Sequence, residues 1–571
     1  MFKRSNTGSQ VDLLGGVPTL LEGRAQTIYT DPDHWHNQFR TQFYERIDES
    51  LFAVLYDQHM GAPNAPVALL ASMIVLKEAF GWSDQQLFEA FRFNTLVRAA
   101  VGLFNLQDSV PTESTYYLFR QRLTQWEAEQ GEDLWTRMFR QVTGGQARAF
   151  EVDGEQIRMD SKLIAANLAR CSRYELVHGV VKNFYESLDA AQRNRLPAAD
   201  RQTLEALSET EARKTVWRST SEQVGQALEE LGELMQRLLE QDEAEAGPEY
   251  ELLERVFAEQ FTPAGAAQPV QVRPGRQVAA DSVQSPHETE CDYRRKRDQQ
   301  VQGYSFNLTE TAGEGPLQLI TDLQTAPASQ ADPKFVAPAL AGTRQVTGQP
   351  VGQVWLDGAF QSPDNDSVCQ GVDMVYTGLP GRPPRYEPER TDQGVWVRDT
   401  QTGITHRARK AHARAPSREQ RWWIQTDAGR RYFGEQALRA GALRRELAAR
   451  PPGELHRRNN VESSLHHLAY PLRGGKTRYR GRYKHQIWAV ARALWINVGR
   501  ITRYGEPTAP ISASGQAQPA AFLKKWIFFS VCHQRASGIA SARDFSLNGA
   551  FFLTLLVLVN DTFRRGLIHN F

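Results

Sequence analysis

The chain has 571 residues, 41% hydrophobic and 10% aromatic content, and a formal net charge of +1. These values are typical of a globular protein, and the length exceeds what one hydrophobic core usually serves, so we expect two to four domains. The four cysteines form no CxxC pair, which argues against a zinc site and a disulfide framework. The longest apolar stretch, residues 550–559, is too short to span a bilayer, and residues 1–5 hold no apolar signal core. We therefore expect a cytoplasmic protein without a membrane partner.

The N-terminal part of the sequence changes from irregular to helical. Residues 1–33 show little periodicity and are predicted to form a flexible arm, whereas apolar residues recur at helical spacing in residues 34–140. Pro66 suits the first turn of one helix, and Ser83 is a good N-cap for the next. Short helices joined by tight turns predict a helical DNA-binding domain, although ordinary helical packing would produce the same periodicity.

A core of strands is expected next, interrupted by a first insertion. Residues 147–160 predict a strand that ends at Asp160, and strands resume within residues 281–361. Between them, residues 161–280 hold leucines three or four apart with glutamates beside them, a pattern that predicts an amphipathic helical insertion followed by a linker.

A second insertion separates this core from the C-terminal helices. Residues 362–436 contain short runs such as Trp422-Trp423-Ile424, which predict a β-rich insertion. Helices that contain Glu462 are predicted for residues 437–505, and a further helical segment for residues 520–571.

Three acidic residues stand at positions where secondary structure does not require them. Asp160 and Asp357 each follow a short strand-like run, and Glu462 opens a helical segment. A sheet can bring strand ends together, and a helix packed on that sheet can supply a third carboxylate. Carboxylate oxygens suit Mg²⁺ or Mn²⁺ better than zinc, and a pair of such ions supports phosphoryl transfer. Most acidic residues are solvated surface groups, so the pattern alone does not establish a metal site.

The charge around Glu462 strengthens its candidacy. Residues 229–259 hold eleven acidic and two basic residues, whereas residues 457–503 hold eleven basic residues and Glu462 as the single acidic one. An ion pair with Arg458, one helical turn earlier, is the alternative role for this glutamate. Exposed pairs of that kind contribute only ~0–1 kcal/mol, so a metal ligand beside bound phosphates explains both the acid and the surrounding bases better.

Two basic runs predict contacts with DNA. Six cations occur within residues 473–484 without an acidic residue, interleaved with glycines and tyrosines, and a shorter run begins at Arg294. Cations in such a run can each contact a backbone phosphate, although a solvated charged surface is the usual alternative. The predicted DNA-binding residues are Arg458, Arg473, Lys476, Arg478, Arg480, Arg482, Lys484, Arg294, Arg295 and Lys296.

The segments Met-Asp-Ser-Lys-Leu-Ile at Asp160, Trp-Leu-Asp-Gly-Ala at Asp357 and Asn-Asn-Val-Glu-Ser-Ser at Glu462 resemble the DDE transposases of bacterial insertion sequences. The likeness covers most of residues 34–503 and is weak in both insertions.

The signature around the glutamate is incomplete. Related transposases often carry a tyrosine, an arginine and a lysine at fixed spacings on the glutamate helix. Arg458 matches the arginine, whereas Leu455 and Ala469 stand at the tyrosine and lysine positions.

The resemblance implies an α/β (α+β overall) fold with a ribonuclease-H-like mixed sheet flanked by helices. Asp160 would lie on the first strand, Asp357 just after the fourth and Glu462 on a following helix. These residues would bind two Mg²⁺ ions, or Mn²⁺ in their place. The expected partners are double-stranded DNA, as element ends and target, and a second copy of the chain in the synaptic complex.

The reaction implied by the resemblance is hydrolysis at the end of an insertion sequence, followed by joining of the 3′-hydroxyl to target DNA. One alternative is a metal-dependent DNA nuclease on the same core. Another is a catalytically inactive DNA-binding regulator.

Overall fold

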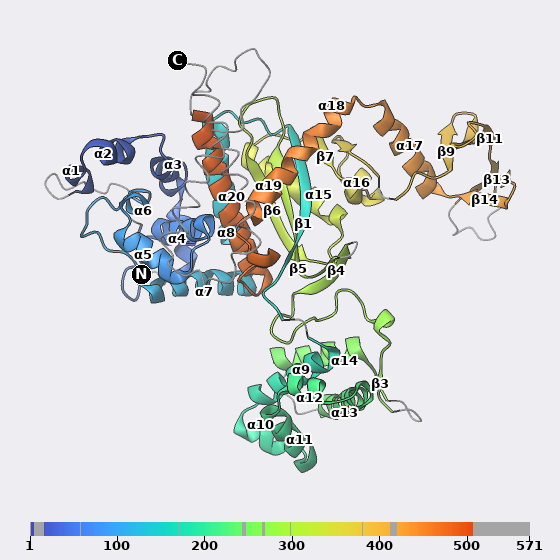
Figure 1. Cartoon of the computed structure of the whole chain (residues 1–571), viewed down its shortest axis with the longest axis horizontal. Helices are drawn as coiled ribbons and strands as arrows, with labels where there is room; N and C mark the ends of the chain where they lie inside the picture. Colours follow the sequence, from blue (N-terminus) through green and yellow to red (C-terminus); the bar gives the residue numbers. More distant parts are fainter. Residues whose placement is uncertain are drawn as a thin grey trace, which may run out of the picture. The chain divides into compact units, whose positions relative to one another are not determined.

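The computed structural model (Figure 1) describes residues 2–4, 16–57, 59–169, 171–241, 247–264, 269–296, 299–379, 381–411 and 420–505. Residues 520–571, for which a helical segment is predicted, lie outside these ranges. No helix in the described ranges has the length and apolar character needed to cross a membrane.

The described N-terminal part is helical. Its elements are α1 (Val17–Leu20), α2 (Gly23–Thr30), α3 (Trp35–Gln42), the 3-10 helices η1 (Tyr44–Arg46) and η2 (Glu49–Leu55), α4 (Val67–Phe80), α5 (Asp84–Phe93), α6 (Thr95–Ala99), α7 (Glu113–Gln130) and α8 (Leu134–Ala149). The prediction of a flexible arm is wrong for α1 and α2, because Val17 and Tyr29 are buried against Ala99. Ser83 forms a capping box at the start of α5, as its position before that helix predicts.

The main sheet has six strands with mixed directions. They are β1 (Gln156–Ala165), β4 (Asp292–Lys296), β5 (Gln299–Thr311), β6 (Ile320–Pro327), β7 (Gln353–Leu356) and β8 (Asp373–Tyr376). Strand β5 pairs antiparallel with β1, β4 and β6, whereas β7 runs parallel to both β1 and β8. The order along the sheet is therefore β6–β5–β1–β7–β8, with β4 also paired to β5.

Strand β1 does not end at Asp160 as predicted. It continues to Ala165 because β5 pairs with its entire second half, from Asp160 opposite Leu308 to Ala165 opposite Gly303. Pairing with β7 is shorter and stops at Arg158. Asp160 thus lies mid-strand, but beyond the point where β7 leaves β1.

Helices cover both faces of this sheet. They are η4 (Asp332–Phe335), α15 (Val336–Thr347), η5 (Gly358–Phe360), α16 (Pro363–Val368), α18 (Pro452–Leu455), η6 (His456–Arg458), α19 (Asn459–Ala469), η7 (Arg473–Gly475) and α20 (Arg482–Gly505). Alternation along β1 divides the faces. Ile157 and Met159 belong to the hydrophobic cluster of α15, whereas Ile164 belongs to the cluster of α20.

The N-terminal helices and the sheet share one hydrophobic core. Helix α20 packs against both α4 and β6, and one cluster of buried side chains extends from Phe39 through Leu308 to Trp488. Trp135 of α8 donates its indole N–H to the carbonyl of Ile487 at 3.1 Å. The helical N-terminal part is therefore packed on the sheet through α20.

The first insertion is a helical unit with its own core. It comprises α9 (Arg173–Ser187), α10 (Ala190–Arg195), α11 (Ala198–Glu209), α12 (Ala212–Arg218), α13 (Ser221–Leu239), α14 (Pro248–Gln260), the short strands β2 (Phe261–Thr262) and β3 (Gln271–Val272), and η3 (Gly275–Gln277). Leu231, Leu234 and Leu238 of α13 are buried, so the leucine spacing correctly predicts an amphipathic helix.

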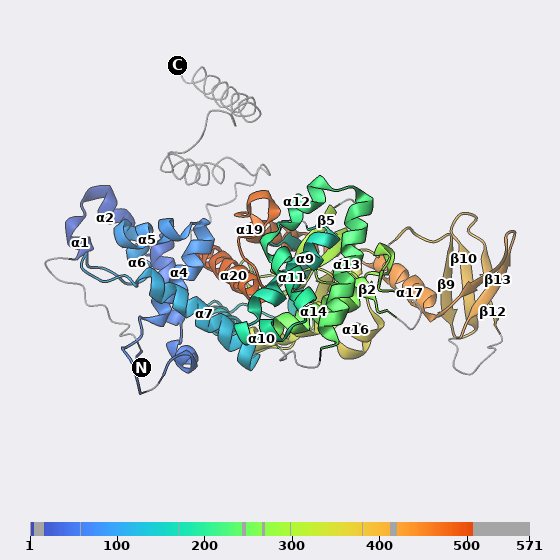
Figure 2. The ribbon, with the colours of Figure 1, turned by 90° about the horizontal axis from the view of Figure 1, so that it is seen from below.

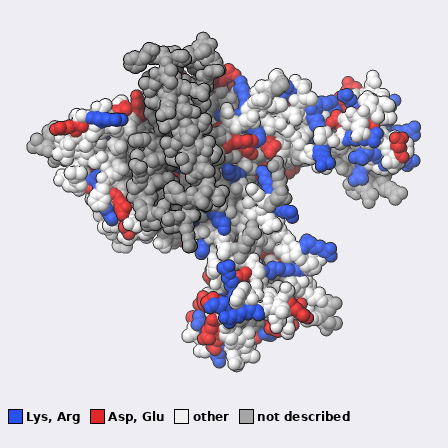
Figure 3. Space-filling view, in the orientation of Figure 1, with Lys and Arg blue, Asp and Glu red and all other residues white. Residues whose placement is uncertain are grey.

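The second insertion consists of two three-stranded sheets, which Figures 1 and 2 draw as a compact group of strands. Its elements are β9 (Tyr386–Thr391), β10 (Gly394–Asp399), β11 (Thr405–Arg407), β12 (Arg409–Lys410), β13 (Trp422–Thr426) and β14 (Gly429–Phe433), followed by α17 (Glu435–Ala449). The insertion begins later than the predicted residue 362, because β8 (Asp373–Tyr376) pairs with β7 and so belongs to the main sheet. Residues 382–433 hold twelve Lys and Arg against six Asp and Glu, and Figure 3 shows several Lys and Arg side chains of the described residues on this group of strands.

Candidate active site

The main sheet places Asp160 beside Asp357. The parallel pairing of β1 with β7 ends at Arg158 opposite Trp355, and each aspartate lies two residues further along its chain. Neighbouring parallel strands in this register bring the two residues to the same edge. The negative charge of Asp357 is one of the causes that raise the pKa of Asp160, in keeping with this placement.

The environment of Asp160 disfavours an isolated negative charge. Burial raises the pKa of Asp160, and the nearby Asp357 carboxylate raises it further, whereas Arg458 and the backbone N–H of Ser161 act in the opposite direction. The Ser161 N–H donates to Oδ1 of Asp160 at 2.8 Å. A cation near this carboxylate pair is therefore stabilising.

Asp357 is held by the turn that follows β7. It is the N-cap of η5, and its Oδ1 accepts the backbone N–H of Gly358 at 2.7 Å. A Cβ atom on Gly358 would lie 2.2 Å from the carbonyl oxygen of Gly378. The absence of a side chain here lets the turn approach the segment after β8.

Arg458 joins the third acidic residue to the first. Its Nη1 donates to Oδ2 of Asp160 and its Nη2 to Oε1 of Glu462, each at 2.8 Å. The Arg458 side chain is 12% exposed and that of Glu462 is 59% exposed. The ion pair considered as an alternative for Glu462 is therefore present, but its arginine also reaches a strand 298 residues away in sequence.

The three acidic residues fit a metal ion in their chemistry but do not form one ligand set in this conformation. Within the described ranges, no three Asp, Glu, His or Cys side chains lie close enough to hold one ion. The guanidinium of Arg458 instead bridges Asp160 and Glu462. Asp160 and Asp357 remain a pair of adjacent hard oxygen donors, which suits Mg²⁺ or Mn²⁺.

A buried ionic cluster beneath these residues was not predicted. Glu310 of β5 is fully buried and accepts hydrogen bonds from Arg158 of β1, Ser464 of α19 and Arg500 of α20. One signal in the sequence points to it. Period-two alternation places Glu310 on the same face of β5 as Phe306 and Leu308, so a carboxylate occupies a core-facing position.

The predicted basic run is partly exposed and partly engaged in structural contacts. Lys476 donates to the carbonyl of Leu168 at 3.1 Å and forms a backbone bridge to Ala165 at the end of β1. Arg478 donates to backbone carbonyls at the end of α4, and Arg482 forms ion pairs with acidic residues of α7 and of the segment before β4. Arg480 is exposed.

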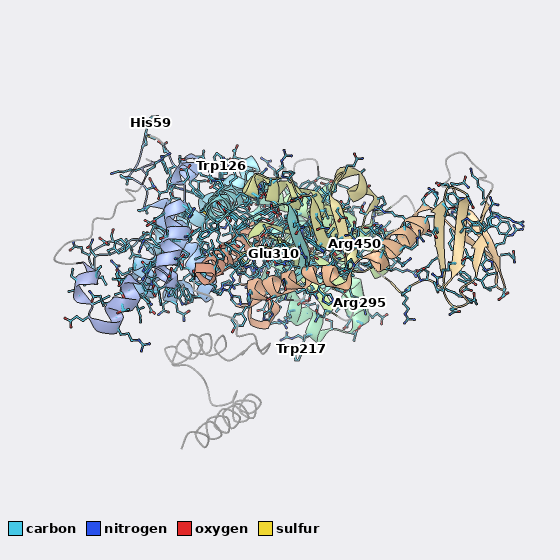
Figure 4. The ribbon with its side chains drawn as sticks, turned by 90° about the horizontal axis from the view of Figure 1, so that it is seen from above. His59, Trp126, Trp217, Arg295, Glu310 and Arg450 are labelled. Atoms are coloured by element: carbon cyan, nitrogen blue, oxygen red, sulfur yellow. The ribbon has the colours of Figure 1, made fainter. Side chains whose placement is uncertain are left out.

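The remaining predicted cations divide in the same way. Lys484 is exposed and lines a cavity of about 450 Å³ between α4, α7 and α20. Arg294 forms an ion pair with Asp332, with atoms 3.0 Å apart, and its role is at least partly structural. Arg295 and Lys296 are exposed on β4, and Figure 4 labels Arg295. The side chain of Arg473 lies outside the described part of the structure.

Comparison with known families adds one finding. Residues 30–122, which run from the end of α2 into α7, match a family model described as "Transposase domain (DUF772)". No curated protein and no solved structure matches the chain. The matched segment does not include the three acidic residues, so it supports a transposase independently of them.

Proposed function

We propose that this protein is a DDE transposase of a bacterial insertion sequence, with Asp160, Asp357 and Glu462 as its catalytic residues. The observation that carries the proposal is the register of β1 and β7, which sets Asp160 beside Asp357, while Arg458 links α19 and its Glu462 to the same place. The transposase-domain match over residues 30–122 supports it from a separate part of the chain.

A ribonuclease-H-like core is part of this proposal. The sheet order β6–β5–β1–β7–β8, with three antiparallel strands followed by two parallel ones, supports such a core. Helices on both faces and two insertions between the acidic residues are compatible with it.

Two Mg²⁺ ions, or Mn²⁺, would be bound by Asp160 and Asp357 with Glu462, and would supply an activated water and stabilise the leaving oxygen. The protein itself contributes orientation. Asp160 is fixed by the Ser161 N–H and Asp357 by the Gly358 N–H, so neither carboxylate has to be ordered when DNA arrives.

Arg458 has a second use in this proposal. Its two Nη atoms now donate to Asp160 and Glu462, and the same pair of donors matches two oxygens of a DNA phosphate. Lys476, Arg480 and Lys484 extend a basic path from the end of β1 towards α20, and we propose that double-stranded DNA follows it. Joining two element ends requires two active sites, so we further propose a homodimer in the synaptic complex.

The decisive experiment uses the full-length protein, duplexes made from the DNA that flanks its gene, and a supercoiled target plasmid. We expect Asp160→Asn to bind the end duplex and to lose Mg²⁺-dependent cleavage and joining. Asp153→Asn is the matched control, because Asp153 lies in the segment before β1 and its Oδ1 accepts the N–H of Glu155, two residues away. Cleavage by Asp160→Asn at the wild-type rate would refute the assignment. Cleavage without joining by the wild type would favour the nuclease alternative, and DNA binding without cleavage the inactive regulator.

A further inference from the structure

We infer that Glu310 is a positioning residue, which fixes the helix that carries Glu462 against the strand that carries Asp160. The inference rests on the proposed function and assigns a role to a residue that contacts neither DNA nor metal in that proposal. Figure 4 labels Glu310 inside the molecule, where strands of the sheet meet the C-terminal helices.

Three elements converge on the carboxylate of Glu310, which is 0% exposed. Its Oε1 accepts from Nε of Arg158 on β1 at 2.6 Å. Its Oε2 accepts from Oγ of Ser464 on α19 at 2.6 Å and from Nη2 of Arg500 on α20 at 2.7 Å. Arg500 and Ser464 are also bonded to each other, at 2.5 Å. Both oxygens are thus satisfied by donors from different parts of the chain.

The donors lie next to the acidic residues of the site. Arg158 is two residues before Asp160 and points to the same face of β1, opposite Glu310 in the register. Ser464 is two residues after Glu462 on α19. Arg158 also donates to the carbonyl of Arg457 at 3.2 Å, at the residue before Arg458. A displacement of the Glu310 carboxylate is therefore transmitted to Asp160 and to Glu462 within two residues.

Stability alone is a poor explanation for this cluster. Burial by itself would raise the pKa of Glu310, but Arg500 and Arg158 lower it, so the carboxylate is charged in the core. Replacing buried ion clusters by apolar side chains is often neutral or stabilising, and their best-attested use is to fix one arrangement of packed elements. Here the arrangement that is fixed is α19 on β1.

The test removes one link and leaves the others. Ser464→Ala deletes the hydroxyl that ties α19 to Glu310, while Arg158 and Arg500 keep the carboxylate paired. Ser464→Thr retains a hydroxyl, and Ser463→Ala is a matched control because Ser463 is exposed on the same helix. Each full-length variant is examined for thermal unfolding, for calorimetric binding of Mn²⁺ without DNA, for binding of end duplexes, and for the Mg²⁺ dependence of single-turnover cleavage.

We expect Ser464→Ala to bind Mn²⁺ more weakly than the wild type and to cleave on the order of 10²-fold more slowly, the effect of an ångström-scale misplacement. Its affinity for the end duplex should stay within about threefold of the wild type. Ser464→Thr should recover much of the loss, and Ser463→Ala should match the wild type. Glu310→Gln, which keeps the shape of the side chain, should show the same pattern more strongly if it folds.

Two outcomes separate this inference from the proposed function. Wild-type protein that binds Mn²⁺ but cleaves no DNA contradicts the proposed function, and the Mn²⁺ affinities of Ser464→Ala and wild type still test the positioning. Equal Mn²⁺ affinity in these two proteins overturns the inference, as does a lower melting temperature with unchanged metal binding and cleavage. Wild-type protein that binds no Mn²⁺ contradicts both.

Discussion

Gly358→Ala tests whether the turn after β7 sets the position of Asp357. A Cβ at residue 358 would lie 2.2 Å from the carbonyl oxygen of Gly378 and 2.8 Å from Cα of Leu379. Ordinary contacts of a Cβ begin near 3.4 Å. Because both obstructing atoms belong to the backbone, no side-chain rotation relieves the overlap. The turn and the segment after β8 must separate by roughly 1 Å.

The expected cost follows from that separation. Overpacking of this size typically destabilises a protein by about 1–3 kcal/mol. The catalytic cost should be larger, because the Gly358 N–H fixes Oδ1 of Asp357 at 2.7 Å and moves with the turn. A misplacement of about 1 Å can lower a rate by about 10²-fold. We therefore expect a folded protein that binds end DNA and cleaves it about 100-fold more slowly than the wild type.

The assay is single-turnover cleavage of a labelled end duplex, with urea unfolding of the same preparation. Gly378→Ala is the matched control, because no atom of the described residues lies within 4 Å of its Cβ position and its φ is not in the left-handed region. The control should cleave within about threefold of the wild type. A Gly358→Ala protein that does the same, while folded, would refute the reasoning about the turn.

Three further predictions concern charge. Arg480→Gln removes an exposed cation and should reduce the slope of log affinity against log salt for duplex DNA by about 0.9, as measured by fluorescence anisotropy; an unchanged slope contradicts a phosphate contact. Arg458→Gln should bind Mn²⁺ more tightly in calorimetry, because Asp160 and Glu462 lose their shared cation, and yet cleave more slowly; weaker Mn²⁺ binding would contradict this. Burial raises the pKa of Asp322 to about 6, so its contribution to stability is full below about pH 4 and is lost as the pH rises through about 6. Between about pH 4 and 7, the free energy of unfolding measured in urea should therefore fall by roughly 2–3 kcal/mol less for Asp322→Asn than for the wild type. Parallel plots of unfolding free energy against pH for the two proteins would contradict this prediction.

The sequence predicts those parts of the site that depend on local patterns. The runs before Asp160 and Asp357 correctly indicate strands, and the segment of Glu462 forms a helix. The prediction that β1 ends at Asp160 is wrong, because pairing with β5 keeps residues 161–165 in the strand. The partner of Ala165 in β5 is Gly303, which lies 138 residues further along the sequence. Period-two alternation indicates that Glu310 faces the core, but no local sequence pattern predicts which residues bond to its carboxylate.

The extent of each insertion depends on long-range pairing in the same way. Residues 373–376 resemble the short strands of the β-rich insertion, and only their pairing with β7 assigns them to the main sheet. The basic run shows the converse limit. Arg482 and Arg480 have the same side chain in the same run, yet Arg482 is paired with Glu127 and Arg480 is exposed. Composition predicts that the run is basic, and folding decides which of its cations remain accessible.

Two carboxylate–arginine clusters stand side by side in this protein, and burial separates their roles. Glu310 is fully enclosed, so removing one of its arginine partners would leave buried charge poorly compensated, an event that typically costs about 3–5 kcal/mol. Glu462 is 59% exposed, so water compensates most of the interaction energy that is lost when its ion pair with Arg458 breaks. The buried cluster therefore keeps α19 on β1, while Glu462, at the exposed end of the other cluster, can exchange the guanidinium for other ligands. A site that must hold its geometry and still admit a metal and a phosphate needs both kinds of contact.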